Sequence, residues 1–388
     1  MIDLPGMVLV WDALPEARVA GGAVRDWLAG RPVADVDFAV PLAPEVVMAR
    51  AAAAGLKAVP TGLAHGTVTL VAGGRGFEVT TLRRDVATDG RHAVVAFTDD
   101  WVEDAARRDF TINAMSMARD GTVYDYFGGR EDLVAGRVRF VGAAAGRITE
   151  DYLRVMRFFR FFAWFGRGAP DAAAVVAIMA LRDGVKTLSA ERVWSEVKKI
   201  LQAPDPVPAL RLMVDTGVMP LVLPGADVAR LEAVMVAGAP PDPVLRVAAL
   251  GCGDVAAFAA RWRLSAAEAA WLEALLVPEV LRPGDDDAAL RRALAGAPAP
   301  VLIGRTWLAG GGGAAWDDLR VRLAALERPV FPLQGRDLAA LGVPAGPRMG
   351  ACLREIRAWW LNGGCMADAA ACRARVVQEI ASGNSLRK

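Results

Sequence analysis

The stretch GGAVRDWLAGRPVADVDFAV, residues 21–40, constrains the fold more than any other part of the sequence. A glycine pair opens it, a helix-like segment over 23–29 follows, and two aspartates separated by one valine lie near its end. Because side chains alternate along a strand, we expect Asp35 and Asp37 on one face and Val36 on the opposite, buried face. The stretch therefore predicts a glycine turn, a helix and a strand that presents two carboxylates.

The two carboxylates and the glycine turn together indicate a chemistry. Like charges this close repel, so a DxD pair is either solvated at a strand end or binds a divalent cation, and oxygen ligands favour Mg²⁺ or Mn²⁺. The backbone N–H groups of Gly21 and Gly22, at the start of a helix, can bind phosphate. The sequence has neither GxGxxG nor GxxxxGK[ST]. A phosphate turn beside a DxD strand then indicates a nucleoside triphosphate with a metal, in phosphoryl or nucleotidyl transfer.

The chain changes character near residue 140. Before that point, short β-branched runs broken by glycines predict strands: ARVAGG, DVDFAV, GTVTLVA, FEVTTL and RVRFV. Beyond it strand patterns almost vanish. We expect a helix from about residue 147, capped by Thr149, and a second over SAERVWSEVKKIL, capped by Ser189. GGGG at 310–313 is short enough to join two of the further amphipathic helices. A mixed α/β part followed by an all-helical part is the expected architecture.

Composition narrows the possible functions. The formal net charge of +1 neither requires nor forbids a polyanionic partner. The four cysteines form no CxxC pair, which argues against a zinc site or a disulfide framework and fits a reducing cytoplasm. The two histidines, His65 and His92, are expected in a turn or strand start and in a solvated loop, so carboxylates must hold any metal. No apolar run reaches the roughly 20 residues of a membrane span, and we expect a soluble cytoplasmic protein.

Five motifs in order carry a resemblance to a known family. After GGAVRDWLAGRPVADVDFAV come RRDFTINAMS at 107–116, DYFGGREDL at 125–133, RFVGAAAGRITEDYLRVMRFFRF from 139 onward and ERVWSEVKKIL at 191–201. This series resembles the bacterial-type tRNA nucleotidyltransferase and poly(A) polymerase family, a branch of the polymerase-β-like nucleotidyltransferases. The C-terminal half carries no motif of equal force.

The resemblance implies a fold and an activity. The fold class would be α+β, a small nucleotidyltransferase head with a mixed sheet followed by helical neck, body and tail. The activity would be template-independent addition of C, C and A to the 3′ end of tRNA from CTP and ATP, with Mg²⁺ as cofactor and Mn²⁺ as a substitute. A poly(A) polymerase, an enzyme adding only CC or only A, and a catalytically silent RNA-binding protein remain alternatives. The expected domains are the head at 1–140, the neck with a nucleobase-selecting helix at 141–203, the body at 204–330 and a tRNA-binding tail at 331–388. No obligate protein partner and no phosphohydrolase domain are expected.

The resemblance also assigns roles near the carboxylates. Asp35 and Asp37 would hold the catalytic metals, and Glu78, in FEVTTL, is the candidate third carboxylate, with a solvated strand residue as the alternative. The phosphate turn would comprise Gly21, Gly22, Arg25 and Asp26, although Asp26 has the alternative of pairing with Arg25.

Two later motifs would bind the rest of the nucleotide. Arg107 and Arg108 suit the triphosphate or ribose, whereas Asp109 and Asn113 suit the sugar hydroxyls. The family's EDxxR motif, here with Asp151 and Arg154, binds the Watson–Crick edge of the incoming base. A carboxylate accepting from the exocyclic amine of cytosine or adenine, and a guanidinium donating to ring acceptors, would select C and A against U and G.

The bland alternative for this motif is an i,i+3 salt bridge between Asp151 and Arg154 on one helical face. Arg157 continues the arginine face as a further nucleotide-binding residue. Residues 83–98 resemble the family's flexible loop, which is tied to the switch from C to A addition.

Overall fold

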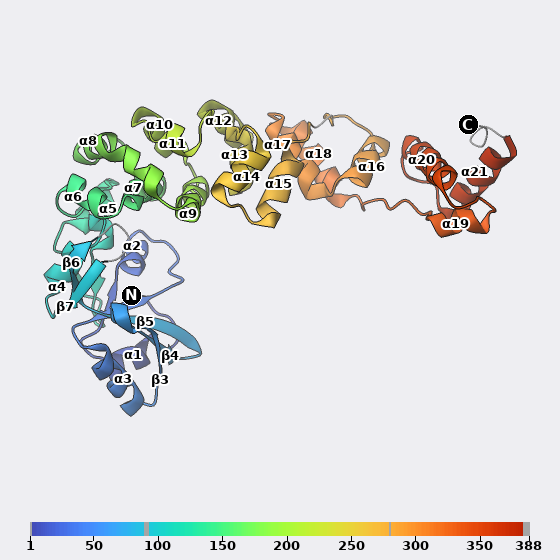
Figure 1. Cartoon of the computed structure of the whole chain (residues 1–388). Coiled ribbons are helices and arrows are strands. Elements are labelled where there is room, and N and C mark those ends of the chain that lie inside the picture. The colour runs from blue at the N-terminus through green and yellow to red at the C-terminus, as the bar shows by residue number, and fades with distance from the viewer. Residues whose placement is uncertain (1, 89–92, 279–280, 383–388) are drawn as a thin grey trace. The chain divides into compact units, whose positions relative to one another are not determined.

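The computed structural model describes residues 2–88, 93–278 and 281–382, which fall into two compact units, Met1–Pro224 and Gly225–Lys388 (Figure 1). The first unit contains both sheets and helices α1 to α11, and in the second the described secondary structure is helical. The predicted α+β class is therefore confirmed, and the strands of the described residues all lie in the N-terminal part.

A seven-stranded mixed sheet organises the first 124 residues in the order β3-β4-β5-β2-β1-β8-β9. Only β2 and β5 run parallel, and the other neighbours are antiparallel. The strands are β1 (Arg18–Ala20), β2 (Asp37–Val40), β3 (Lys57–Gly62), β4 (Thr67–Ala72), β5 (Arg75–Thr81), β8 (Ser116–Met117) and β9 (Val123–Tyr124).

Helices α1 (Met7–Ala13) and α3 (Pro44–Ala53) contact one another and β4, on one side of the sheet. The ring of Phe38 in β2 packs edge-on against Trp11 of α1 and Phe77 of β5, with ring centroids 5.4 and 6.0 Å apart. Since side chains alternate along a strand, Asp37 points to the opposite face. The packing of Phe38 against α1 therefore places the Asp37 carboxylate on the other face of the sheet, away from this core.

Four of the five predicted strands are present, but RVRFV at 137–141 is not one of them. Only an isolated bridge joins Phe140 to Phe110. The Phe140 ring lies 4.7 Å from that of Phe110 and 6.0 Å from that of Phe158, so this segment contributes to an aromatic core instead of extending the sheet.

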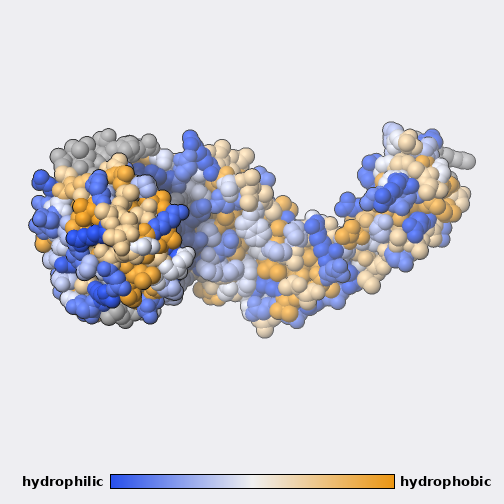
Figure 2. All heavy atoms as spheres, turned by 90° about the horizontal axis from the view of Figure 1, so that it is seen from below, coloured by the Kyte–Doolittle hydropathy of each residue, from blue (hydrophilic) through white to orange (hydrophobic). Residues whose placement is uncertain are grey.

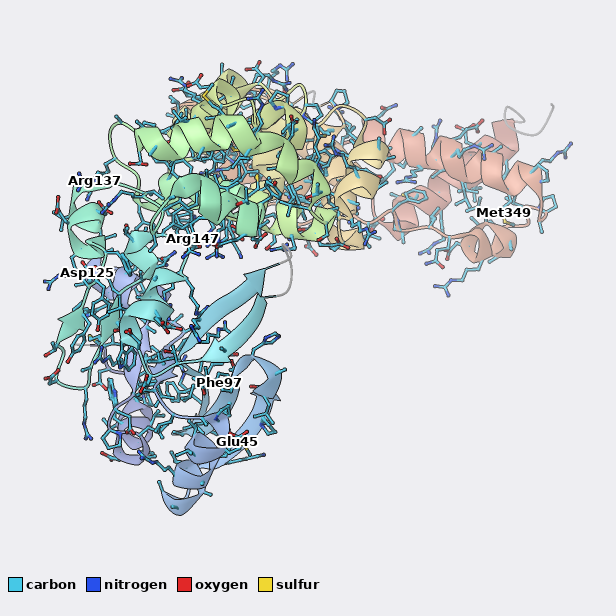
Figure 3. The ribbon with its side chains drawn as sticks, turned by 60° about the vertical axis from the view of Figure 1, so that its left-hand side comes forward. Glu45, Phe97, Asp125, Arg137, Arg147 and Met349 are labelled. Carbon is cyan, nitrogen blue, oxygen red and sulfur yellow. The ribbon has the colours of Figure 1, made fainter. Side chains whose placement is uncertain are left out.

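The expected loop at 83–98 is instead largely a two-stranded sheet of β6 (Arg83–Thr88) and β7 (Ala93–Phe97), with Phe97 at its end (Figure 3). Its β-branched and aromatic residues favour strands, and they outweighed the polar residues and glycine that suggested a loop. His92 lies outside the described residues.

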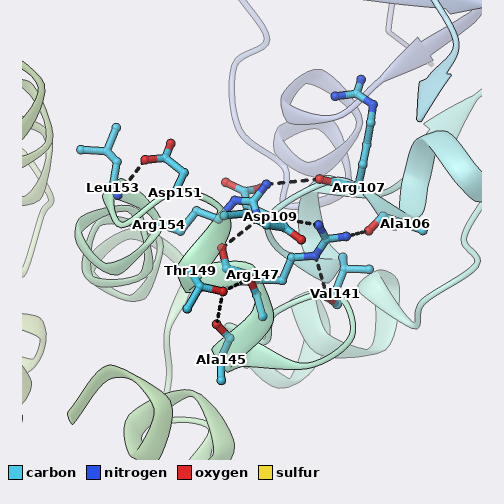
Figure 4. Close-up of polar contacts among 12 residues, drawn as sticks. Ala106, Arg107, Asp109, Val141, Ala145, Arg147, Thr149, Asp151, Leu153 and Arg154 are labelled. Carbon is cyan, nitrogen blue, oxygen red and sulfur yellow. Dashed lines mark hydrogen bonds and ion pairs between the residues drawn. The ribbon is translucent and has the colours of Figure 1, made fainter. Parts of the chain in front are cut away.

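The predicted helix from about residue 147 is two helices, α6 (Ala144–Glu150) and α7 (Leu153–Phe165). Asp151 between them has an extended backbone, with φ −156° and ψ 108°, and its carboxylate accepts a 3.0 Å hydrogen bond from the Leu153 N–H (Figure 4). The cap expected at Thr149 is wrong, because Thr149 lies inside α6 and donates to the Gly146 carbonyl at 2.8 Å.

The second predicted helix is α9 (Ala190–Leu201), with Ser189 at the N-cap position but without a side-chain capping hydrogen bond. Its apolar stripe is buried as the pattern predicts. The remaining helices of the first unit are α2 (Gly22–Leu28), α4 (Trp101–Ala106), α5 (Gly129–Ala135), α8 (Ala172–Leu181), α10 (Val207–Asp215) and α11 (Met219–Val222), with 3₁₀ turns at Leu63–His65, Thr111–Asn113 and Arg182–Thr187.

The second unit is a succession of short helices with separate apolar clusters, one around Leu290, Leu302 and Leu319 and another around Leu338, Ile356 and Trp360. GGGG at 310–313 joins α17 to α18, as expected. The helices are α12 (Val228–Val236), α13 (Pro243–Leu250), α14 (Val255–Trp262), α15 (Ala266–Leu276), α16 (Asp287–Gly296), α17 (Ala299–Leu308), α18 (Ala314–Ala325), α19 (Gly335–Ala340), α20 (Pro347–Asn362) and α21 (Ala369–Ser382).

Hydrophilic and hydrophobic residues are interspersed on the face of the molecule seen in Figure 2. Within the described ranges, no helix combines the length and the apolar character needed to cross a bilayer.

Candidate active site

Three carboxylates gather at the start of β2. Asp37 is the first residue of the strand, and its register partner on the parallel neighbour β5 is Glu78. Asp35 is exposed and precedes the strand, so the expectation that both aspartates are strand residues is wrong for Asp35, whereas Val36 is buried as predicted. Asp37 is exposed, yet partial desolvation together with the charges of Glu78 and Asp35 raises its pKa, while Arg108 acts in the opposite sense. The cluster thus holds an excess of negative charge.

This charge pattern suits a hard divalent cation. Within the part of the chain that the structure describes, no group of three or more His, Cys, Asp or Glu side chains is arranged to hold a metal ion by itself. Mg²⁺ in nucleotide sites commonly takes one or two carboxylates from the protein and completes its shell with phosphate oxygens and water. The carboxylates at β2 and β5 fit that partial donor set.

The glycine turn between β1 and α2 has a conformation that requires glycine. Gly21 has φ +70° and ψ −122°, and a Cβ placed on it would lie 2.8 Å from Nη1 of Arg108. Its N–H donates to the Met115 carbonyl at 3.0 Å, which ties the turn to the segment that carries Arg108. The missing side chain lets a guanidinium lie directly against the backbone.

A cavity of about 600 Å³ opens beside this turn, within the size range of small-molecule sites. It gathers most of the sequence-predicted nucleotide-binding residues, namely Gly21, Gly22, Arg25, Arg108, Asp109, Asn113, Asp151, Arg154 and Arg157. Asp26 and the three carboxylates of the β2 cluster do not line it. Eight arginines and two aspartates do, so the cavity suits an anionic ligand.

A buried network forms one wall of the cavity. Asp109 accepts hydrogen bonds from Arg157 Nε at 2.6 Å and Asn113 Nδ2 at 3.0 Å, and Asn113 Oδ1 accepts from Arg25 Nη1 at 2.6 Å. Burial alone would raise the pKa of Asp109, but Arg157 and the Asn113 hydrogen bond outweigh it and the pKa is lowered. Arg25 also forms a 2.9 Å ion pair with Asp26, the pairing given as the alternative for Asp26. These side chains are positioned before any ligand binds.

Phe161 forms an apolar surface amid the cations. The guanidinium carbons of Arg25, Arg157 and Arg160 lie 5.0, 5.5 and 4.2 Å from its ring centroid. Burial lowers the pKa of Arg160 to about 10, although its 3.0 Å ion pair with Glu196 opposes that shift. The ring keeps three like charges apart and attracts each of them.

The two residues of the EDxxR motif have separate partners. Asp151 Oδ2 accepts from Arg192 Nη2 at 2.7 Å, whereas Arg154 pairs with Glu150 and donates to the Arg147 carbonyl at 2.9 Å. No ion pair between Asp151 and Arg154 occurs among the described residues, which removes the i,i+3 salt bridge as their explanation. Both side chains line the cavity.

Sequence reasoning did not assign five of the cavity's residues to nucleotide binding: Arg83, Leu153, Arg160, Phe161 and Arg192. Arg192 follows Glu191 on α9, and its pairing with Asp151 spans 41 positions. Local spacing carries no signal for such a contact. Arg107 and Arg108, by contrast, share Asp104 at i,i+3 and i,i+4, which lowers the pKa of Asp104 against the effect of burial.

Two family models match this chain. The one described as "Poly A polymerase head domain" matches residues 17–139, and the one described as "Probable RNA and SrmB- binding site of polymerase A" matches residues 170–230. The first range contains the β2 carboxylates and the glycine turn, and the second contains α9.

Characterised proteins are similar over most of the chain. The mouse (Mus musculus) protein named "CCA tRNA nucleotidyltransferase 1, mitochondrial" is 37% identical over 90% of this chain and 83% of its own length. A Geobacillus thermodenitrificans "CCA-adding enzyme" is 41% identical over 54% of this chain and 51% of its own length. The crystal structure of the Bacillus stearothermophilus CCA-adding enzyme in complex with CTP superposes with a TM-score of 0.78 and 30% identity, covering 97% of each chain. This chain belongs to the CCA tRNA nucleotidyltransferase family.

Proposed function

We propose that the protein adds C, C and A in turn to the 3′ end of tRNA, using CTP and ATP and releasing pyrophosphate at each step. The observation that carries the proposal is the arginine-lined cavity between the glycine turn and the Asp151–Arg154 pair, beside the β2 carboxylates. The cavity would take a triphosphate and a base edge, and the β2 carboxylates, which do not line it, would hold a metal.

The triphosphate would lie against the glycine turn and the arginine pair at 107–108. Arg108 already contacts the backbone of the segment through a weak 3.4 Å hydrogen bond to the Asn113 carbonyl, and its guanidinium can donate further N–H groups to phosphate oxygens. Arg25 and Asp109 would stabilise the conformation of the glycine turn, and the side-chain amide of Asn113 would hydrogen-bond to the ribose.

The family generally uses a divalent metal, and we propose Mg²⁺, with Mn²⁺ as a substitute. Asp35 and Asp37 would hold it, with Glu78 as the third carboxylate beside Asp37. Bound there, the metal would supply charge neutralisation for the α-phosphate and the leaving pyrophosphate in a two-metal transfer. The chain's own part is to orient the triphosphate so that the RNA 3′-hydroxyl faces the α-phosphate.

Base selection would fall to Asp151 and Arg154. The Asp151 carboxylate is held by Arg192 and by the Leu153 N–H, and each of its oxygens keeps a lone pair for an exocyclic amine. Arg154 is held by Glu150 and keeps N–H donors for ring acceptors. Amine-bearing cytosine and adenine satisfy both residues, whereas the carbonyl of uracil or guanine would face a carboxylate.

The domain plan and the compartment remain part of this proposal. Head, neck, body and tail would span 1–140, 141–203, 204–330 and 331–388, with tRNA bound by the helical parts. All four cysteines are free thiols, which fits the cytoplasm, while the mouse relative carries a mitochondrial name. Fractionation of cells expressing the tagged chain would identify the compartment.

The test supplies purified protein and Mg²⁺ with tRNA transcripts ending before CCA, after C and after CC, each with labelled CTP, ATP or both. Products are sized at single-nucleotide resolution. Two C residues and then one A, with no further growth, is the expected result. Long A tails on varied RNAs would instead indicate a poly(A) polymerase, the activity suggested by the wording of both family models.

Other outcomes of the same test are equally readable. Arrest after CC, or activity only on transcripts ending in CC, would indicate a partial enzyme. No incorporation with Mg²⁺ or Mn²⁺ would indicate a silent RNA-binding protein.

A further inference from the structure

A second cavity of about 540 Å³ adjoins the first. The two share Arg25, Arg160 and Phe161 as a common wall. The rest of the second cavity is lined by three parts of the chain. Arg31 follows α2, Trp164 lies at the end of α7, and Lys199 lies in the last turn of α9. The roles given above to the nucleotide, the metal and the base leave this space unused.

The charge of the second cavity favours an anion. Four cations line it, Arg25, Arg31, Arg160 and Lys199. Asp26 pairs with Arg25, and Glu196 serves both Arg160 at 3.0 Å and Lys199 at 3.6 Å. Two positive charges are therefore left in excess, and Arg31 has no carboxylate partner among the described residues.

Its apolar side favours a planar ring. The Arg31 guanidinium lies 4.4 Å from the Trp164 ring centroid and 4.9 Å from that of Phe165, and the Trp164 indole N–H donates to the Lys199 carbonyl at 2.8 Å. The indole is thus fixed in place and only partly buried. A cation beside a fixed aromatic ring is the combination with which proteins bind a nucleotide's phosphate and base.

The position of the second cavity relative to the carboxylates suggests the source of such a nucleotide. Pro32, at its edge, precedes Asp35 by three residues, a span of at most about 11 Å of extended chain. A nucleotide in this cavity would lie within a short reach of the reacting 3′-hydroxyl. We propose that the cavity of Arg31, Trp164 and Lys199 binds a nucleoside phosphate unit, supplied by the RNA strand next to its growing 3′ end.

The assignment to RNA rests on the proposed function, whereas the chemistry of the site does not. A free nucleotide offers the same phosphate and base, so the experiment separates the two sources. The test variant is Arg31→Gln with Lys199→Gln. The control variant, Lys57→Gln with Arg130→Gln, removes the same charge from exposed residues of the same unit that line neither cavity and lie outside the range matched by the RNA-binding family model.

The RNA arm measures the dissociation constant of a tRNA transcript ending in C, by filter binding without nucleotide, and compares it with a transcript whose 3′ end is blunt. We expect the test variant to bind the first transcript about tenfold more weakly than wild type, which is the loss of one or two charge-assisted contacts. The blunt transcript should lose much less, and the control variant should change neither by more than about twofold. Trp164→Leu, which keeps every charge, should show the same transcript dependence.

The free-nucleotide arm counts labelled CTP bound per chain by equilibrium dialysis. Two CTP per wild-type chain and one per test-variant chain, with unchanged RNA binding, would assign the cavity to a free nucleotide. The proposal is overturned if the test variant matches the control in both arms. Failure of the proposed function is a separate result, since it would appear as no C or A incorporation by the wild-type chain, and neither binding arm requires incorporation.

Discussion

Two acidic regions of the first unit, one around Asp37 and one around Asp109, are built in opposite ways. Asp37 has Glu78 as its register partner and Asp35 nearby, and its pKa is raised by desolvation and by those two charges. Asp109 is more deeply buried, yet Arg157 and Asn113 lower its pKa. The charge of Asp37 is therefore left for a bound cation to compensate, whereas Asp109 is already paired with Arg157.

The difference separates binding from support. A cluster of uncompensated like charges costs stability, and such a cost is retained where a ligand relieves it. A compensated buried carboxylate instead fixes the geometry of the groups around it, here Arg157, Asn113 and, through Asn113, Arg25. Substitutions in the first region should remove activity without loss of stability. Substitutions in the second region should primarily lower the stability of the folded protein.

The largest expected effect is on activity at the first region. Asp37→Asn keeps the shape of the side chain but removes the charge, and we expect a loss of about a thousandfold in C incorporation, or about 4 kcal/mol of barrier. Because Asp37 is exposed and the charges of Glu78 and Asp35 disfavour its charged form, the melting temperature measured with a chelator should not fall. A fall in melting temperature together with retained activity would contradict the comparison.

The second effect is on stability at the second region. Arg157→Ala leaves the Asp109 carboxylate buried without its ion pair, and the free energy of unfolding should fall by about 2 kcal/mol, measured by urea denaturation. In an Asp109→Asn background the same substitution should cost clearly less. Arg119→Ala, which breaks an exposed pair with Asp12, is the control and should change stability by less than about 0.5 kcal/mol.

A third prediction concerns the turn that joins the two regions. Gly21→Ala and Gly30→Ala both force alanine into a positive φ, +70° and +68°, at a cost of about 1 kcal/mol each. Only at Gly21 does the new methyl group meet the Arg108 guanidinium, since nothing lies within 4 Å of a Cβ at Gly30. We expect Gly21→Ala to cost about 1 kcal/mol more and to raise the KM for CTP, and Gly30→Ala to leave KM unchanged. Equal KM values would show that Arg108 does not bind the triphosphate.

Local pattern was enough for much of the fold. Alternation in DVDFAV correctly buried Val36, and the apolar stripe of SAERVWSEVKKIL correctly predicted α9. The strand predicted at RVRFV is wrong because an alternating run can pack into an aromatic core as well as pair along a sheet. The sequence alone does not show that Phe140 contacts Phe110 and Phe158. The break at Asp151 was missed because a carboxylate that accepts the Leu153 N–H ends one helix and begins the next within two residues.

The candidate site divides along the same line. The resemblance to a family gave Arg107 and Arg108 their expected roles and linked motifs that are far apart. The partners could not be assigned, because Arg192 with Asp151 and Arg157 with Asp109 are 41 and 48 positions apart. Such pairs are set by how the elements that carry them pack in the folded chain, and no local period encodes that packing.

The smallest effect is on the pH dependence of stability. A carboxyl group whose pKa is lowered on folding stabilises the protein above its unfolded pKa, near 4 for aspartate, and this contribution is lost as pH falls through the lower folded value. The wild-type chain should therefore exceed Asp109→Asn in free energy of unfolding at pH 7. Each pKa unit is worth about 1.4 kcal/mol, and the difference should shrink as urea denaturation is repeated from pH 5 towards pH 3. Asp215→Asn, at an exposed position of α10, is the control and should change the free energy of unfolding at pH 7 by less than about 0.5 kcal/mol. A difference between wild type and Asp109→Asn that stays constant through this range would mean that Asp109 is not held in its charged form by Arg157. That result would contradict the contrast drawn between Asp109 and Asp37.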